Sequence, residues 1–173
     1  MTTVIIAGYP GVGKTVIADL LARSTGAALL NRDSFAKPLS MNMVPKYFED
    51  YDAFYDENSY ALYEGLQQQA IENIHLDTVI LAPFHDTDGI RDALHKKGMK
   101  TLFVLVTADP EHHHSQLIRS GRVRDVEKAE QFDEWLNSLP KFDEKKFDLI
   151  ISSSEKTPQQ NVQLIREQLS LKS

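Results

Sequence analysis

Short apolar runs recur along the chain, separated by longer stretches in which apolar residues return every three or four positions. Five runs are rich in β-branched and aliphatic residues, a pattern typical of strands that are buried on both faces of a sheet. The predicted strands are Thr3–Ala7, Ala27–Leu30, Val79–Ala82, Thr101–Val106 and Leu149–Ile151.

Helices are predicted between these strands, and Thr157 and Gln160 form a capping box at the start of the last one. Five strands alternating with helices predict an α/β fold, a parallel sheet with helices on both faces. No repeat, low-complexity tract or linker divides residues 1–173, so we expect a single domain. The predicted helices run from Lys14 to Gly26, from about Glu57 to His75, from Ile90 to Lys97, from Asp109-Pro110 onward and from Thr157 onward.

The composition excludes several classes of functional site and of binding partner. The 173 residues include no cysteine, which excludes disulfides, thiolate zinc sites, iron–sulfur clusters and cysteine nucleophiles. The 19 basic and 25 acidic residues give a net charge of -6, which makes nucleic acid an unfavourable partner. No apolar stretch approaches the roughly 20 residues of a membrane-spanning helix, and no signal peptide is visible. We therefore expect a cytoplasmic protein without a membrane partner, while its oligomeric state stays open.

The segment from Gly8 to Thr15, GYPGVGKT, matches the phosphate-loop pattern GxxxxGK[ST] between the first strand and the first helix. Glycines let the backbone N–H groups point at the phosphates, to which the helix presents its positive end. Lys14 is expected to reach the transferred phosphate and Thr15 to ligate Mg²⁺, so ATP and Mg²⁺ are the expected cofactors. The expected nucleotide-binding residues in this segment are Gly8, Gly11, Val12, Gly13, Lys14, Thr15 and Val16.

The run from Ile5 to Thr15, followed by Asn31-Arg32-Asp33-Ser34-Phe35, resembles the small P-loop kinases. These include adenylate, shikimate and gluconate kinases and the group with chloramphenicol phosphotransferase and zeta-toxin-like kinases. The resemblance implies a three-layer P-loop NTPase fold with a five-stranded parallel sheet. It also implies an ATP- and Mg²⁺-dependent kinase that transfers the γ-phosphate to a hydroxyl of a small molecule.

Asp33 lies just past the second predicted strand, where ligands bind in open α/β sheets. In the kinases that this chain resembles, an aspartate here contacts the acceptor hydroxyl or a Mg²⁺-bound water, so Asp33 is a candidate catalytic and metal-binding residue. The alternative is that Asp33 caps the following helix.

The third predicted strand departs from the pattern of many P-loop enzymes, which end a strand with a magnesium-binding aspartate. Here the strand continues Leu81-Ala82-Pro83-Phe84, and no acid follows until Asp86. Magnesium would then rest on Thr15, the phosphates and Asp33 through water. The departure keeps one alternative open, a nucleotide-binding switch or degenerate NTPase without an acceptor. A polynucleotide 5′-hydroxyl kinase is the other, although the net charge disfavours it.

Three arginines, Arg119, Arg122 and Arg124, fall within six residues in a lid-like segment at about 119–132. By resemblance, Arg122 and Arg124 would neutralise charge on the transferred phosphoryl group, and Arg119 would pack near the adenine. The alternative is a solvated basic loop balanced by nearby acidic residues.

Two further features carry less weight. His112, His113 and His114 point about 100° apart on a helix and do not converge on one ion, so we interpret them as a solvated helix start. The acidic, aromatic stretch 47–56 either lines the acceptor pocket or packs its rings on the core. If it lines the pocket, it disfavours an anionic acceptor, with Lys37, Lys46 and Arg91 as candidate counter-charges.

Overall fold

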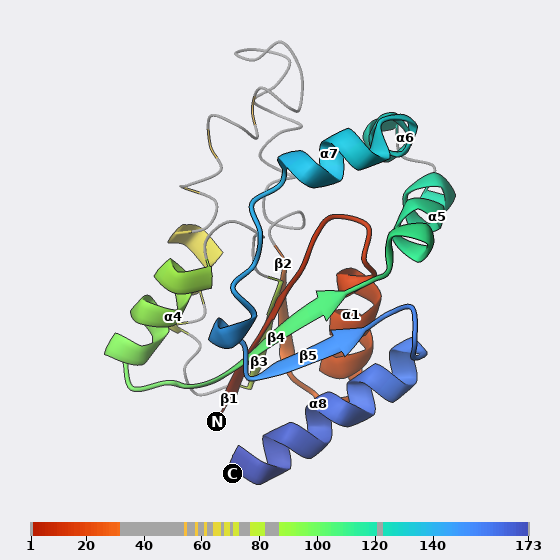
Figure 1. The fold of residues 1–173 in the computed structure, drawn as a ribbon. Helices are drawn as coiled ribbons and strands as arrows, with labels where there is room; N and C mark the ends of the chain where they lie inside the picture. The colour runs from red at the N-terminus through yellow and green to blue at the C-terminus, as the bar shows by residue number, and fades with distance from the viewer. Residues whose placement is uncertain are drawn as a thin grey trace.

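The computed structural model describes residues 2–31, 77–81, 87–120 and 123–172, together with single residues and short groups between 54 and 72. Figure 1 shows the strands side by side, with helices in front of and behind them. The strands are β1 (Thr2–Ala7), β2 (Ala28–Asn31), β3 (Thr78–Leu81), β4 (Lys100–Thr107) and β5 (Leu149–Ser152). The helices are α1 (Lys14–Thr25), α4 (Thr87–Lys96), α5 (Pro110–Ser120), α6 (Val123–Glu130), α7 (Phe132–Ser138), the 3₁₀ turn η1 (Glu144–Lys146) and α8 (Pro158–Lys172).

The five strands form one parallel sheet in the order β2-β3-β1-β4-β5, which confirms the predicted five-stranded parallel α/β fold. β1 lies at the centre, where Val4 is opposite Val79 of β3 and Leu102 of β4. Because all strands point the same way, the loops that follow β1 and β4 emerge beside each other at one edge of the sheet.

Alternation along β1 explains why this strand is apolar from Val4 to Ala7. Val4 and Ile6 belong to a core that includes residues of α1 and α8, whereas Ile5 and Ala7 belong to a second core with α4. Successive side chains of a strand point to opposite faces, so both faces of the sheet are covered. One core therefore lies on each face of the sheet, between the sheet and the helices that cover it. The fold has the three layers of a sheet with helices on both faces.

The helix ends follow local signals where these exist. At the start of α8, the Gln160 N–H donates to the Thr157 hydroxyl, and the Thr157 N–H donates to the Gln160 side-chain oxygen, which confirms the capping box. α4 begins at Thr87, three residues before the predicted start at Ile90. The first turn is polar, so the apolar periodicity does not reveal it.

The long helix predicted from about residue 57 to 75 lies partly outside the described residues. Those described between 58 and 72 are all helical. Of the stretch 47–56, only Phe54 is described, and its side chain is 3% exposed, as expected for a ring packed on the core.

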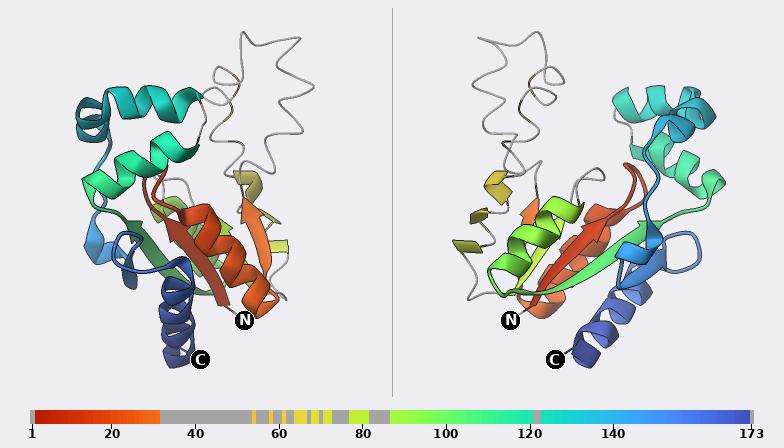
Figure 2. Two further views of the ribbon diagram at one scale, coloured as in Figure 1. Left: turned by 90° about the vertical axis from the view of Figure 1, so that its right-hand side faces the viewer. Right: turned by 60° about the vertical axis from the view of Figure 1, so that its left-hand side comes forward.

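The helices α5, α6 and α7 gather at the edge of the sheet toward which the strands point, above the loop that joins β1 to α1 (Figure 2). Within the described ranges, the structure contains no helix of the length and hydropathy required to cross a bilayer.

Candidate functional site

The loop from Gly8 to Gly13 joins β1 to α1 and packs tightly on two neighbouring elements. Gly8 has a φ of 147°, and a Cβ on it would lie 2.4 Å from the carbonyl oxygen of Val106 in β4. Gly11 has a φ of 86°, and its Cβ would lie 2.5 Å from Cδ2 of Leu117 in α5. Both positions require glycine, because L residues rarely adopt these angles and a side chain has no room.

The N-terminus of α1 is open to an anion. Its N-cap residue, Gly13, makes no side-chain capping hydrogen bond, and the first turn of α1 contains no acidic residue. The first N–H groups of a helix lack partners within the helix and carry its positive dipole end. Thr15 and Val16 are exposed on this first turn, whereas Val12 is buried. The arrangement suits a phosphate group.

Lys14 keeps its ammonium group at the loop. Its Nζ donates to the carbonyl oxygen of Tyr9 at 2.7 Å, and the side chain is half-buried. A cation and a helix N-terminus therefore lie on the same short segment, so the segment concentrates positive charge.

Tyr9 ties the loop to a distant part of the chain. Its hydroxyl donates to the carbonyl oxygen of Pro140 at 3.0 Å, and its ring lies 5.0 Å from the ring of Phe142, centroid to centroid. Burial raises the pKa of the Tyr9 phenol, which therefore stays a neutral donor. The motif pattern leaves this position unrestricted, so sequence reasoning missed the contact.

His113 of α5 holds the loop from the other side. Its side chain is 2% exposed, and its Nε2 lies 2.6 Å from the carbonyl oxygen of Pro10. The interpretation of the three histidines as a solvated helix start is thus wrong for His113. Leu117, one turn further along α5, is also buried. The spacing of four residues between them was the available signal that His113 belongs to the inner face.

The pKa of His113 lies below its ordinary value, chiefly because burial disfavours the charged imidazolium. The carbonyl of Pro10 acts in the opposite direction, and the charges of Lys14 and His112 lower the pKa further. A carbonyl oxygen only accepts hydrogen bonds, so Nε2 of the neutral ring carries the hydrogen.

Acid is expected to destabilise the wild type more than the variant His113→Gln. Below the ordinary histidine pKa of 6.5, the unfolded chain binds a proton that the folded chain, with its lowered pKa, does not bind. The free energy of unfolding therefore falls as the pH decreases through this range, by at most about 1.4 kcal/mol per pH unit for one group. Urea unfolding of both proteins between about pH 7.5 and about pH 5 measures this difference. If the free energy of unfolding depended on pH in the same way in wild type and His113→Gln, the prediction would be wrong.

The other predicted site residues are only partly described. Arg119 is exposed in the last turn of α5, and the backbone of Arg124 lies in α6. Asp33 and Arg122 lie outside the described residues, as do Asp86, Lys37 and Lys46. Their roles stay predictions.

Arg91, a candidate counter-charge, belongs to the packing of α4 on the sheet. Its guanidinium carbon lies 3.8 Å from the centroid of the Phe103 ring, and its Nη2 donates to the carbonyl of Lys146. These contacts account for its position without an acceptor.

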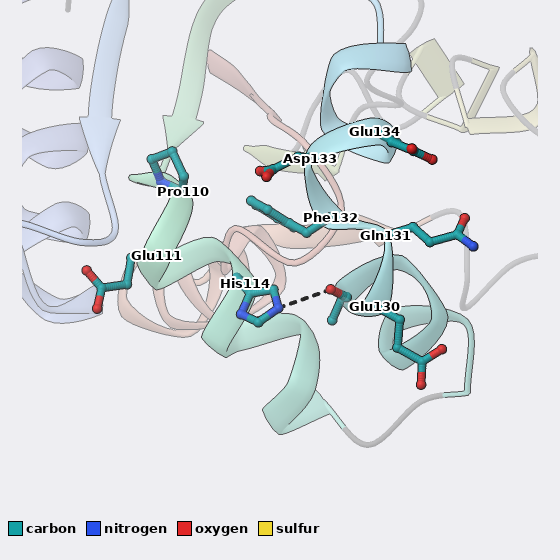
Figure 3. A pocket seen from close by; sticks show the side chains of 9 residues that line it. Pro110, Glu111, His114, Glu130, Gln131, Phe132, Asp133 and Glu134 are labelled. Atoms are coloured by element: carbon teal, nitrogen blue, oxygen red, sulfur yellow. Dashed lines mark hydrogen bonds between the residues drawn. The ribbon is translucent and has the colours of Figure 1, made fainter.

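An open groove of about 760 Å³ lies between α5, α6 and α7. Figure 3 shows acidic side chains arranged around the rings of His114 and Phe132. His114 bonds through Nε2 to the carbonyl of Ala129 at 3.0 Å. The carboxylates of Glu111, Glu130, Asp133 and Glu134 repel phosphate, so this groove is not the phosphate site.

Magnesium fits the donors on α1. Mg²⁺ prefers oxygen ligands and is usually held by one or two side chains together with substrate phosphates and water. The exposed Thr15 hydroxyl supplies such an oxygen beside the positive end of α1. Among the described residues, no group of three or more His, Asp or Glu side chains forms a protein-only metal cage.

The parallel sheet and the phosphate loop define the P-loop kinase fold. Shikimate kinase from Bacteroides thetaiotaomicron superposes with a TM-score of 0.61 at 15% identity, covering 98% of this chain and 98% of that chain. A gluconokinase from Sinorhizobium meliloti gives 0.63 at 12% identity, covering 99% and 97%. The APS kinase of Mycobacterium tuberculosis, solved with AMPPNP and APS, gives 0.65 at 16% identity, covering 98% and 97%.

The sequence model of the Zeta toxin family matches residues 2–162, so the chain belongs to the Zeta toxin family. This confirms the resemblance to small P-loop kinases. No curated protein sequence matches the chain. The family and the kinase folds of its neighbours support a phosphotransferase as the broad class of enzyme.

Proposed function

We propose that this protein is an ATP- and Mg²⁺-dependent kinase that transfers the γ-phosphate to a hydroxyl of a small molecule. The observation that carries the proposal is the start of α1, where an uncapped helix N-terminus, the Lys14 ammonium and the exposed residue Thr15 lie together on three consecutive residues. This set of groups matches the needs of a nucleotide polyphosphate. The related fold of an APS kinase solved with AMPPNP supports the choice of ATP.

The residues of the loop bind and orient ATP in this proposal. The N–H groups at the start of α1 and Lys14 hold the β- and γ-phosphates, and Lys14 balances charge on the transferred group. Bound Mg²⁺ supplies further neutralisation of the phosphates, with Thr15 as its protein ligand and Asp33 acting through water. In the segment 119–132, Arg122 and Arg124 cover the phosphoryl group, while Arg119 packs near the adenine.

Asp33 completes the proposed reaction. In the sequence it comes two positions after Asn31, the last residue of β2, and β2 is parallel to β1, the strand that the phosphate loop follows. Its carboxylate accepts the proton of the acceptor hydroxyl as the acceptor oxygen bonds to the γ-phosphorus. The bond from the γ-phosphorus to the β–γ bridging oxygen breaks, and ADP leaves.

Asp33→Asn is expected to lower acceptor-dependent ATP turnover by roughly 10²-fold, the usual scale for loss of a general base. ATP affinity is expected to change little, because the phosphate loop is a separate segment and Asp33 acts on Mg²⁺ only through water. The melting temperature is also expected to stay unchanged, because Asn caps a helix about as well as Asp. The measurement is ATP turnover with the best acceptor from a screen of small hydroxyl compounds.

Asp92→Asn is the matched control, since Asp92 is an exposed aspartate of α4. Equal turnover in wild type and Asp33→Asn would remove Asp33 from the mechanism. Binding of ATP without acceptor-stimulated turnover in the wild type would instead favour a nucleotide switch or degenerate NTPase. This alternative stays open because no acidic residue directly follows the strand that ends at Leu81.

A further inference from the structure

We propose that His113 is a positioning residue that sets the phosphate loop in its nucleotide-binding shape through the carbonyl of Pro10. The inference rests on the proposed function, and it assigns a role to the buried imidazole of α5 that the phosphate-loop motif does not contain.

The hydrogen bond fixes one peptide unit of the loop. Nε2 of His113 lies 2.6 Å from the Pro10 oxygen. The Pro10 carbonyl and the Gly11 N–H belong to the same planar trans peptide and point in opposite directions. Holding the carbonyl against α5 therefore directs the Gly11 N–H away from α5. A phosphate loop binds its ligand with N–H groups that point inward, so the orientation of this peptide matters for affinity.

The ring of His113 is itself fixed by α7. Its centroid lies 5.3 Å from that of Phe132 and 5.6 Å from that of Trp135, with the rings edge to face. Such contacts restrict the movement of the ring. Cδ2 of His113 also lies 3.4 Å from where a Cβ on Gly11 would be, so the imidazole packs directly on the loop that it bonds.

The position of the donor nitrogen decides which substitutions preserve the contact. In His113→Gln, the side-chain amide nitrogen reaches about as far as Nε2 and can donate to the same carbonyl. In His113→Asn, the amide is shorter and falls near the place of Nδ1. His113→Phe keeps a ring between Phe132 and Trp135 but has no donor, so it leaves the Pro10 carbonyl without this partner.

The first measurement is hydrogen exchange of the Val12 amide, made on the full chain without nucleotide, because the Val12 N–H donates to the Tyr9 carbonyl at 3.4 Å and closes the turn around the Pro10–Gly11 peptide. We expect this amide to exchange about 10-fold faster in His113→Phe and His113→Asn than in wild type, the scale of one lost hydrogen bond. His113→Gln is expected to stay close to wild type. His114→Phe is the matched control, because His114 bonds the carbonyl of Ala129 in α6 and not the loop.

The second measurement is the affinity for ADP with Mg²⁺ by calorimetry. The dissociation constant is expected to rise about 10-fold in His113→Phe and His113→Asn and to stay within about twofold of wild type in His113→Gln. Equal exchange and affinity in all three variants would overturn the proposal. A loss in His113→Gln as large as in His113→Phe would also overturn it, because the ring and not the donor would then be responsible.

The two proposals fail in different ways. If the wild type binds no ADP but the exchange pattern of the variants is as expected, the nucleotide function is wrong and the positioning of the loop by His113 stands. If the wild type binds ADP and the variants match it in both measurements, the nucleotide function stands and the role of His113 is wrong.

Discussion

Lys14→Ala is expected to abolish ATP binding measurable by calorimetry and to lower turnover by about 10³-fold, the upper range for removing one donor from a charge-stabilising site. The expected cause is the loss of the only side-chain cation within the motif from Gly8 to Thr15. The melting temperature is expected to fall by no more than about 3 °C, because the side chain contributes to no core.

Arg23→Ala is the control for Lys14→Ala. Arg23 is an exposed residue in the last turn of the same helix, where it pairs with Asp19 at 2.9 Å. Its removal changes the net charge by the same amount at the far end of α1. Unchanged turnover and ATP affinity are expected for this control. Equal ATP affinity of Lys14→Ala and wild type would exclude the loop as the nucleotide site.

Gly8→Ala is expected to destabilise the fold by about 3 kcal/mol, near the upper end for a group forced into a packed interior. The added Cβ would lie 2.4 Å from the Val106 carbonyl oxygen, and this atom belongs to the backbone of β4, which is hydrogen-bonded to β1 and β5. Relief therefore requires a shift of the central sheet. For a chain of this size, the melting temperature should fall by about 10 °C, measured by a thermal melt.

Gly26→Ala measures the cost of a positive φ without a steric overlap. Gly26 also has a positive φ, of 72°, but a Cβ there meets nothing within 4 Å. Only the cost of the backbone angle remains, about 1 kcal/mol. A loss of stability in Gly8→Ala no larger than in Gly26→Ala would contradict the close approach of the loop to β4.

Features that depend on neighbouring residues could be predicted from the amino-acid sequence. Runs such as Thr3–Ala7 and Thr101–Val106 predict the central strands, because β-branched residues favour extended backbone and continuous apolarity indicates burial on both faces. The phosphate loop and the capping box at Thr157 are also local, since each is formed by residues only a few positions apart. For this reason the fold class could be predicted, and the phosphate-loop motif could be recognised.

The contacts that hold the loop join segments that are far apart in the sequence. Tyr9 bonds Pro140, 131 positions away, and His113 bonds Pro10, 103 positions away. His113 meets Pro10 because β4 pairs with β1, so the start of α5 lies beside the loop that follows β1. Periodicity indicates that a helix face is apolar, but it does not identify the distant segment that this face covers. The sequence therefore gives no partner for a histidine on the inner face of α5. The strand order depends on long-range packing in the two cores. This order brings His113 next to the carbonyl of Pro10.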